Sequence, residues 1–451
     1  MTGAPVSGRQ ALLVTEALAL PSSGGGGMDT QCHLIALKQL GYHVALAYWR
    51  EDEAVRTAEP RFKAALAGVA LIDLSKRAPP SGLRSGAGEP AGVRVRVLRR
   101  LGLDLEAWFG GRRYAAALRE VVSELRPEFV MVHTFPALAA LSKIPRVPVL
   151  FEMEPFPSHL QALSLRYRTL PSRRGLRKLL AVLKCFLMRP ILRRQEVALA
   201  ARSTHIVAMD PGQGAWLGRK LGRPVSTYQA PILDGLTTRQ FDRPRKKKVI
   251  LVGHLRGLLS LCSLEYLAEH LADRLWRELE EPFELHIIGD YELPEWLGRL
   301  RSYEHIRFRG RIHDIEPEFR TADVVLSTST LDFGSSTRVR AALAFGAVLV
   351  AHRNSSRGVP ELRHEENALL CDTPDDFIRN LRRSFTDREL CERLRRNARK
   401  TYEESFSLEA HQRQLARLID ITLDRFRTSQ VAPTTHAFPQ LSRSAQPHPI
   451  S

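Results

Sequence analysis

Residues 326–362 read LSTSTLDFGSSTRVRAALAFGAVLVAHRNSSRGVPEL, and this stretch determines the predicted fold. An apolar run at 324–326 leads into a polar loop, after which apolar residues recur at helical spacing from Val339 to Phe345. Gly346 ends that pattern, and residues 348–351 form a second apolar run. The order predicts a strand, a loop, a helix and a second strand, which is the repeating unit of a parallel α/β sheet.

The loop of this unit has the composition of an anion site. Small and hydroxyl-bearing residues precede the predicted helix, namely Gly334, Ser335, Ser336 and Thr337. Free N–H groups and the helix dipole favour phosphate at such a position. Arg338 and Arg340 could add charge-assisted hydrogen bonds to a diphosphate. An ordinary strand-to-helix turn with exposed arginines is the alternative, and these residues alone leave both interpretations open.

The same stretch resembles the donor-site segment of GT-B glycosyltransferases of the family 4 kind, the glycosyl transferases group 1. The family pattern runs E-G-F-G-x-x-x-x-E-A-x-A-x-G-x-P-V-V and ends in G-x-x-E-L. Phe333-Gly334, the run ALAFG at 342–346 and GVPEL at 358–362 follow it. The two family glutamates are absent, because Phe333 and Ala341 occupy their positions. Asp332 lies one residue from the first of these positions and could replace that glutamate.

Further motifs in the second half are similar to the family in the same order. They comprise a strand opening onto Gly253-His254-Leu255-Arg256-Gly257, a strand at 283–288, the run IRFRGRIHD at 306–314 and ADVV at 322–325. The resemblance implies that Arg256 and Arg338 act in catalysis by offsetting charge on a leaving diphosphate, with Asp332 as a third catalytic residue. It also implies a donor-binding set of Gly253, His254, Gly334, Ser335, Ser336, Thr337 and Glu361.

The first half follows the family more loosely. A strand at 10–15, a glycine run at 24–27, a helix and a strand at 44–48 predict a mononucleotide-type unit. The glycines come too late and too continuously for the G-x-G-x-x-G of a dinucleotide site, which makes an NAD site the weaker alternative. The resemblance implies instead that a glycine loop and polar strand ends face the acceptor. The acceptor-side residues expected from it are Gly25, Gly26, Gly27, His133, Glu152 and Glu154.

Charge is unevenly distributed along the chain. Residues 246–451 carry 31 Lys and Arg against 30 Asp and Glu, so residues 1–245 hold 36 of the 67 basic and 19 of the 49 acidic residues. A strongly cationic first half indicates an anionic partner, such as a membrane surface, a lipid-phosphate acceptor, an acidic glycan or nucleic acid. No basic-aromatic interleaving or nucleic-acid motif accompanies the charge, so we do not expect nucleic acid as a partner.

Residues 164–196 supply much of that charge. Ten Arg and Lys lie between Arg166 and Arg194 without an acid, interleaved with large apolar residues. Such a stretch can lie in the interface of an anionic membrane. The alternative is a domain helix that buries its apolar stripe and exposes its arginines. Pro190 is expected to kink or end the helix.

No apolar run is long enough to span a bilayer, and the five cysteines lack metal-ligand or disulfide spacing. We therefore expect a cytoplasmic protein, peripheral on the inner membrane face if residues 164–196 bind lipid. The predicted fold class is α/β of the GT-B type, with two doubly wound, Rossmann-like domains facing a central cleft. The expected parts are an acceptor-side domain at 1–245, a donor domain at 246–405, a returning helix at 406–428 and a disordered tail at 429–451.

The function implied by the resemblance is transfer of a sugar from a nucleotide-diphosphate donor to a glycan or lipid-linked acceptor. Retention of configuration, no metal and no cofactor beyond the nucleotide-sugar substrate are implied in the same way. The missing glutamates motivate an alternative, a non-catalytic GT-B-like protein that binds a nucleotide, a glycan or a membrane partner.

Overall fold

The computed structural model describes residues 8–18, 25–51, 64, 66–77, 114–141, 146–171, 175–228, 231, 247–255, 257–289, 293–312, 314–332 and 337–431. Four of the predicted site residues lie outside these ranges: Arg256, Gly334, Ser335 and Ser336. The predicted domain boundary at 245/246 and most of the predicted tail also lie outside them, so both stay predictions.

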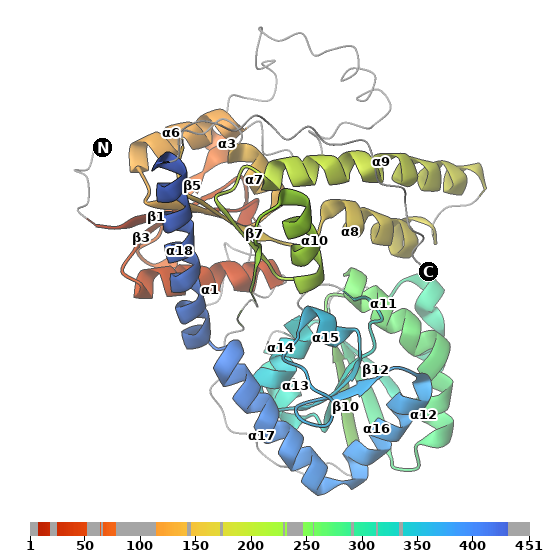
Figure 1. Cartoon of the computed structure of the whole chain (residues 1–451). Coiled ribbons are helices and arrows are strands. Elements are labelled where there is room, and N and C mark those ends of the chain that lie inside the picture. Colours follow the sequence, from red (N-terminus) through yellow and green to blue (C-terminus); the bar gives the residue numbers. More distant parts are fainter. Residues whose placement is uncertain are drawn as a thin grey trace.

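The chain forms two separate parallel sheets (Figure 1). The strands of the first, in spatial order, are β5 (Ala70–Asp73), β3 (His43–Tyr48), β1 (Gln10–Val14), β6 (Phe129–Val132), β7 (Val149–Met153), β8 (His205–Ala208) and β9 (Ser226–Thr227). Every pairing in it is parallel. A small parallel pair, β2 (Ala17–Leu18) with β4 (Arg50–Glu51), lies beside it.

The second sheet has the same character. Its strands in order are β12 (Ile306–Gly310), β11 (Phe283–Ile288), β10 (Lys247–Val252), β13 (Val324–Ser327), β14 (Val348–His352) and β15 (Leu369–Cys371). Its pairings are likewise all parallel. In both sheets the chain order reverses beside a central strand, β1 or β10, which is the doubly wound arrangement. The predicted α/β architecture is confirmed.

Helices cover both faces of each sheet because the central strands are apolar on both sides. Alternate residues of β1 enter two different cores, Leu12 and Val14 in one and Ala11 and Leu13 in the other. The first core contains α6 (Ala115–Leu125), α7 (Phe135–Ala140) and α9 (Leu176–Ala200). The second contains α1 (Gly25–Gln39) and the last helix, α18 (Leu408–Val431), which packs against α1, β7 and β8. The last described helix therefore packs on the domain that contains the first described strand.

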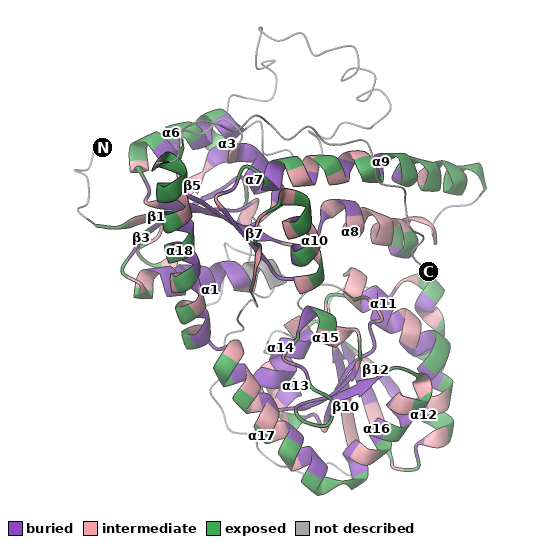
Figure 2. Cartoon of the chain, viewed as in Figure 1, coloured by how far each residue is buried: buried purple, intermediate pink, exposed green. Residues whose placement is uncertain are grey.

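The second sheet is covered in the same way. One core holds α11 (Leu258–Tyr266), α12 (Ala272–Glu278) and α16 (Pro374–Thr386), and the other holds α13 (Glu316–Thr321), α14 (Thr337–Ala344) and α17 (Arg388–Ser405). The remaining helices are α3 (Leu74–Arg77), α8 (Pro157–Ser164), α10 (Pro211–Leu221) and α15 (Ser355–Gly358). In the cartoon coloured by burial, the central strands and the helix faces next to them are mostly buried (Figure 2).

The predicted glycine loop was wrong, and Pro190 does not end its helix. Gly25, Gly26 and Gly27 form the first turn of α1 instead of a loop. Pro190 lies inside α9, and the helix continues ten residues beyond it to Ala200. Burial explains the second case, because Met188, Leu192 and Leu199 pack this half of the helix into the domain core. That packing offsets the loss of one backbone hydrogen bond at a proline.

Candidate functional site

Polar and glycine residues gather at the carboxyl ends of the strands in both sheets, the edge where open α/β sheets bind ligands. In the second sheet, Gly253 follows β10 and Gly289 follows β11. Gly253 N–H donates to Ile288 O at 3.0 Å, and Gly257 N–H donates to His254 O at 2.7 Å, which closes a tight turn before α11. His254 is exposed on this turn.

Gly253 and Gly289 leave no room for a side chain, because neighbouring atoms lie too close to them. A Cβ on Gly289 would lie 1.9 Å from the carbonyl oxygen of Gly253. A Cβ on Gly253 would lie 2.4 Å from Ser260 Oγ and 2.5 Å from Arg338 Nη2. The two turns and the guanidinium of Arg338 are thus in direct contact. We call Gly253, Gly289 and Arg338 the glycine–arginine group.

Arg338 is buried beneath this turn, with 8% of the residue exposed. Its Nη1 donates to Ser263 Oγ at 3.1 Å, its Nη2 donates to Ser260 Oγ at 3.2 Å, and its Nε donates to the carbonyl of Val252. Burial lowers the pKa of Arg338 to about 10, so the group stays cationic at neutral pH. Within the described part of the chain, no carboxylate forms an ion pair with it. The result is a buried positive charge beside a glycine turn.

Arg340, two residues further along α14, points to the other domain. It is 1% exposed, and its Nη1 lies 3.0 Å from Pro231 O and 3.7 Å from Asp29 Oδ1 in α1. The expectation that Arg340 assists Arg338 at a diphosphate is not supported by this direction. Burial raises the pKa of Asp29 to about 7, although the charge of Arg340 opposes that rise. This ion pair joins the two domains.

The other predicted donor residues are spread along the same edge. Thr337 begins α14, and its Oγ1 lies 3.5 Å from Arg340 Nη2. Asp332 is exposed, and its carboxylate accepts from Arg357 Nη1 at 3.0 Å. Burial raises the pKa of Glu361. Ala341, at the second absent family glutamate, is buried in the α14 core.

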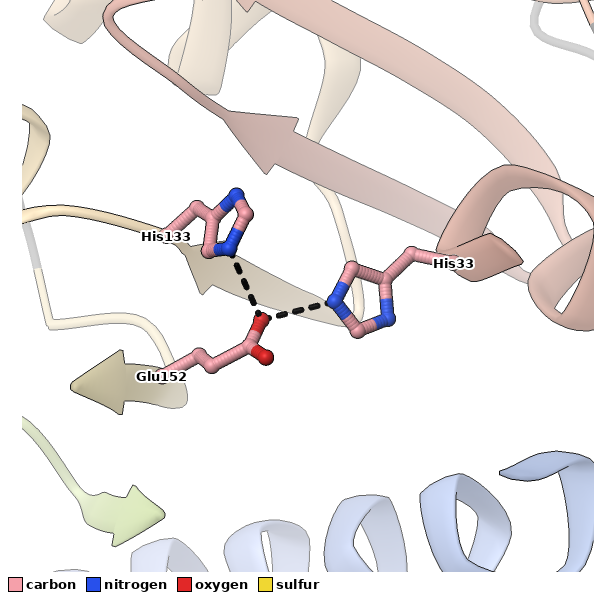
Figure 3. Close-up of side chains that lie close together, drawn as sticks. All are labelled: His33, His133 and Glu152. Atoms are coloured by element: carbon pink, nitrogen blue, oxygen red, sulfur yellow. Dashed lines mark hydrogen bonds and ion pairs between the residues drawn. The ribbon is translucent and has the colours of Figure 1, made fainter. Parts of the chain in front are cut away.

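The first domain contributes the histidine–carboxylate cluster, which we define as His33, His133 and Glu152 (Figure 3). His33 comes from α1, His133 follows β6, and Glu152 lies in β7. His33 Nε2 and Glu152 Oε2 form a 2.7 Å hydrogen bond, and His133 Nε2 lies 3.6 Å from the same oxygen. All three residues are at most 1% exposed. Two predicted acceptor-side residues, His133 and Glu152, are therefore brought together.

Burial disfavours the charged forms of these three side chains. It lowers the pKa of His33 to about 3, lowers the pKa of His133, and raises the pKa of Glu152 against the opposing charges of His133 and Arg340. Glu154, two residues after Glu152, has a pKa raised to about 8 by burial and by the charges of Asp29, Glu152 and Glu16. Glu154 is half-buried. Carboxyl groups that titrate between about 7 and 8 are suited to proton transfer at neutral pH.

The last helix completes this region. The His411 ring of α18 lies 5.0 Å from the His33 ring, and Tyr228 OH lies 2.9 Å from His411 Nδ1. Sequence reasoning missed Asp29, His33, Gly289 and His411. Asp29 and His33 lie four residues apart on one helix after the glycine run, a spacing that places them on one face and could have signalled them. Nothing local to His411 indicates its place, since α18 reaches the site from the far end of the chain.

Known structures share the two-domain fold of this chain. Sucrose-phosphate synthase from Thermosynechococcus elongatus aligns with a TM-score of 0.62 and 14% identity, over 91% of this chain and 98% of that one. Anabaena HepE in complex with UDP and glucose aligns with a TM-score of 0.57 and 15% identity, over 91% and 99%. A TarM mutant from S. aureus in complex with Fondaparinux, alpha-GlcNAc-glycerol and UDP aligns with a TM-score of 0.62 and 8% identity, over 91% and 100%.

The chain has the GT-B fold. Residues 246–387 match the family model of glycosyl transferases group 1, which confirms the resemblance seen in the sequence of this domain. No curated protein sequence matches the chain. The matched segment contains the glycine–arginine group and α14, whereas the histidine–carboxylate cluster and Asp29 lie outside it.

Proposed function

We propose that the chain is a glycosyltransferase that moves a sugar from a nucleotide-diphosphate donor to a glycan or lipid-linked acceptor. The buried guanidinium of Arg338, beneath the Gly253 turn and without a carboxylate partner in the described residues, is the observation that carries the proposal. A diphosphate on this turn would supply the missing negative charge. Preorganised positive groups of this kind stabilise the charge that develops on a leaving group.

The fold neighbours support the donor class. HepE was solved with UDP, with UDP-glucose and with UDP and glucose, and TarM with UDP. By the same resemblance we propose that the sugar is transferred with retention of configuration and without a metal at the diphosphate. Arg256, His254 and Asp332 remain predicted partners of the donor, and Gly334, Ser335, Ser336, Thr337 and Glu361 remain its predicted binding residues.

Carboxylates from the first domain compensate, in this proposal, for the absent family glutamates. Phe333 and Ala341 cannot accept hydrogen bonds from sugar hydroxyls. Asp29 reaches the α14 region through its 3.7 Å ion pair with Arg340. Glu152 and Glu154 lie at the end of β7 in the same electrostatic neighbourhood. His133, Glu152 and Glu154 are proposed to contact the acceptor and the transferred sugar.

The first test is a binding and turnover panel. Calorimetry with UDP, GDP and ADP should detect one nucleotide per chain, and the corresponding nucleotide-sugar should be hydrolysed slowly without added Mg²⁺ or Mn²⁺. Binding without hydrolysis or transfer, with any acceptor offered, would favour the non-catalytic alternative that the missing glutamates suggest. Binding of none of the three nucleotides would contradict the proposed donor site.

We further propose that the basic helix of the first domain attaches the enzyme to an anionic membrane. Most of the first half of α9 is exposed, including Phe186 at 76% and Leu176 at 69%, whereas Ala181 is partly buried and Cys185 is buried (Figure 2). Its other exposed apolar side chains are Leu179, Leu180, Val182, Leu183 and Leu187. Exposed cations alternate with them at Arg177, Lys178, Lys184 and Arg189. The alternative interpretation, a domain helix that buries its apolar residues, describes only the second half of α9, from Cys185 onward.

Apolar groups with interleaved cations suit the headgroup region of an anionic bilayer. Within the described residues, no helix is both long and apolar enough to cross a membrane. Vesicle co-sedimentation tests the attachment. Phe186→Ser should lower the affinity for anionic vesicles about tenfold, from the ~1.5 kcal/mol of one buried aromatic side chain. Trp276→Ser is the matched control, an exposed aromatic residue of the other domain. Equal recovery with neutral and anionic vesicles would contradict the attachment.

A further inference from the structure

We propose that His33, His133 and Glu152 form a binding site for one divalent transition-metal ion, with Zn²⁺ the best match to the ligand atoms. The three side chains point toward one another from α1, the end of β6 and β7 (Figure 3). One donor atom from each lies within 4.8 Å of the other two. All three ligands belong to the first domain, so metal binding here does not depend on nucleotide binding by the second.

Unpartnered polar atoms point to a missing ligand. Among the described residues, His133 Nε2 and Glu152 Oε1 are buried and find no hydrogen-bond partner, and the same holds for His33 Nδ1 and Asp29 Oδ1 nearby. Leaving such an atom unpaired costs about 1–3 kcal/mol, and native proteins leave few of them. A cation between His133 Nε2 and the carboxylate of Glu152 would satisfy both.

Two of the three ligand separations are close to those of a zinc site, and the third is at most 4.8 Å. Zn–N and Zn–O bonds of about 2.0–2.2 Å in a tetrahedral site place ligand atoms about 3.3 Å apart. His33 Nε2 is 2.7 Å and His133 Nε2 is 3.6 Å from Glu152 Oε2, so both separations would change by less than 1 Å. Two imidazoles and one carboxylate form a set of three protein ligands that zinc accepts, with a further position left for water or substrate.

The charges of the surrounding groups also favour a cation. Three carboxyl groups in this neighbourhood, Asp29, Glu152 and Glu154, interact electrostatically with one another, while Arg340 is the cation that acts on Asp29 and Glu152. A divalent ion would offset the remaining negative charge if all three carboxyl groups ionise. It would also connect α1 to the ends of β6 and β7.

Metal binding can be measured on the untagged full-length chain without nucleotide. After removal of bound metals with a chelator, titration with Zn²⁺ should show one ion per chain and raise the melting temperature. Co²⁺ should produce the visible absorption bands of a tetrahedral N/O site. Sub-stoichiometric Zn²⁺ binding, or Co²⁺ without these bands, in the wild-type protein would overturn the proposal, and this result needs no variant.

Variants locate the site. His133→Gln and Glu152→Gln should each weaken Zn²⁺ binding at least ~100-fold, because even substitutions around a metal's ligands cost 10–100-fold. His305→Gln is the matched control, since His305 is a buried histidine of the second domain whose two ring nitrogens find no hydrogen-bond partner within the described ranges. Circular dichroism should show that each variant is folded. Unchanged Zn²⁺ affinity in folded His133→Gln and Glu152→Gln would also overturn the proposal.

Discussion

The glycine–arginine group of the second domain and the histidine–carboxylate cluster of the first handle buried charge in opposite ways. Arg338 is a single cation surrounded by hydroxyl and carbonyl oxygens, with a backbone held close by two glycines. The cluster contains two imidazoles and a carboxyl group. Burial shifts their pKa values in the direction that favours the neutral form of each. The first is suited to hold a fixed anion, and the second to exchange protons or bind a cation. Arg340 and Asp29 connect the two regions.

The largest expected effect tests the buried cation. Arg338→Ala should raise the barrier for donor hydrolysis by about 2–4 kcal/mol, the usual cost of removing one preorganised charge. Because Arg338 also joins α14 to β10 and α11, the variant should also lose stability. Rates are therefore compared at a temperature where both proteins are folded. Ser263→Ala is the control, since it removes one hydrogen bond of Arg338 and keeps the charge of the guanidinium. An Arg338→Ala variant that keeps its activity would refute the catalytic role of Arg338.

The second prediction concerns the close contact between Gly253 and Gly289. Gly289→Ala places a Cβ 1.9 Å from the Gly253 carbonyl, so the two turns must separate. We expect a loss of about 2–3 kcal/mol in the free energy of unfolding, near the upper end for overpacking, together with weaker nucleotide binding. Gly298→Ala is the matched control, because a Cβ at that position would have no atom within 4 Å. Urea denaturation that finds both variants equally stable would contradict the packing argument.

A third prediction separates Arg340 from Arg338. Arg340→Met leaves Asp29 buried without its cation and should cost about 1–3 kcal/mol of stability, less than the usual 3–5 for a broken buried pair because Asp29 can take up a proton. The cost should grow as the pH rises through about 7, where Asp29 ionises. Denaturation at pH 6 and pH 8.5 measures it. The double variant with Asp29→Asn should lose this pH dependence, and an unchanged dependence would exclude Asp29 as its source.

A fourth, smaller effect concerns Glu154. Its pKa is about 8 in the folded state and near 4.5 in the unfolded chain, so the unfolded state ionises first and the free energy of unfolding falls as the pH rises between these values. Glu154→Gln removes this contribution. As the pH rises, the free energy of unfolding of the variant should therefore fall by about 1–2 kcal/mol less than that of the wild type, a value reduced because Glu154 is partly exposed. Parallel declines measured from pH 5 to pH 8 would contradict the raised pKa.

The smallest effect on stability is expected at α9. Phe186→Ser should change the free energy of unfolding by less than about 0.5 kcal/mol, since surface substitutions seldom do more. Met188→Ser, two residues along the same helix, should cost about 2 kcal/mol or more because Met188 is fully buried. Thermal melts of both variants give the comparison. A large loss in Phe186→Ser would mean that the exposed half of α9 is packed against the protein.

Local patterns determined the strands and most helices. Apolar runs such as 249–252 and 324–326 are buried on both faces, and a chain that alternates such runs with helices has few arrangements other than parallel sheets. The strands end where these apolar runs stop. The sequence alone therefore placed Gly253, His133 and Glu152 at the ligand-binding edges of the sheets. Helix boundaries were less predictable: burial of Met188 and Leu192 carried α9 past Pro190, which local propensity cannot anticipate.

The sequence by itself determined the two-sheet architecture and the positions of the turns, because both depend on residues near one another in the chain. Only the tertiary structure decided which way the arginines of α14 point, and that Asp29, His33 and His411 join residues from β6 and β7. The reason is physical: the direction of a buried charge is set by its partners, and the partners of Arg340 and His33 lie 311 and 119 residues away in Asp29 and Glu152.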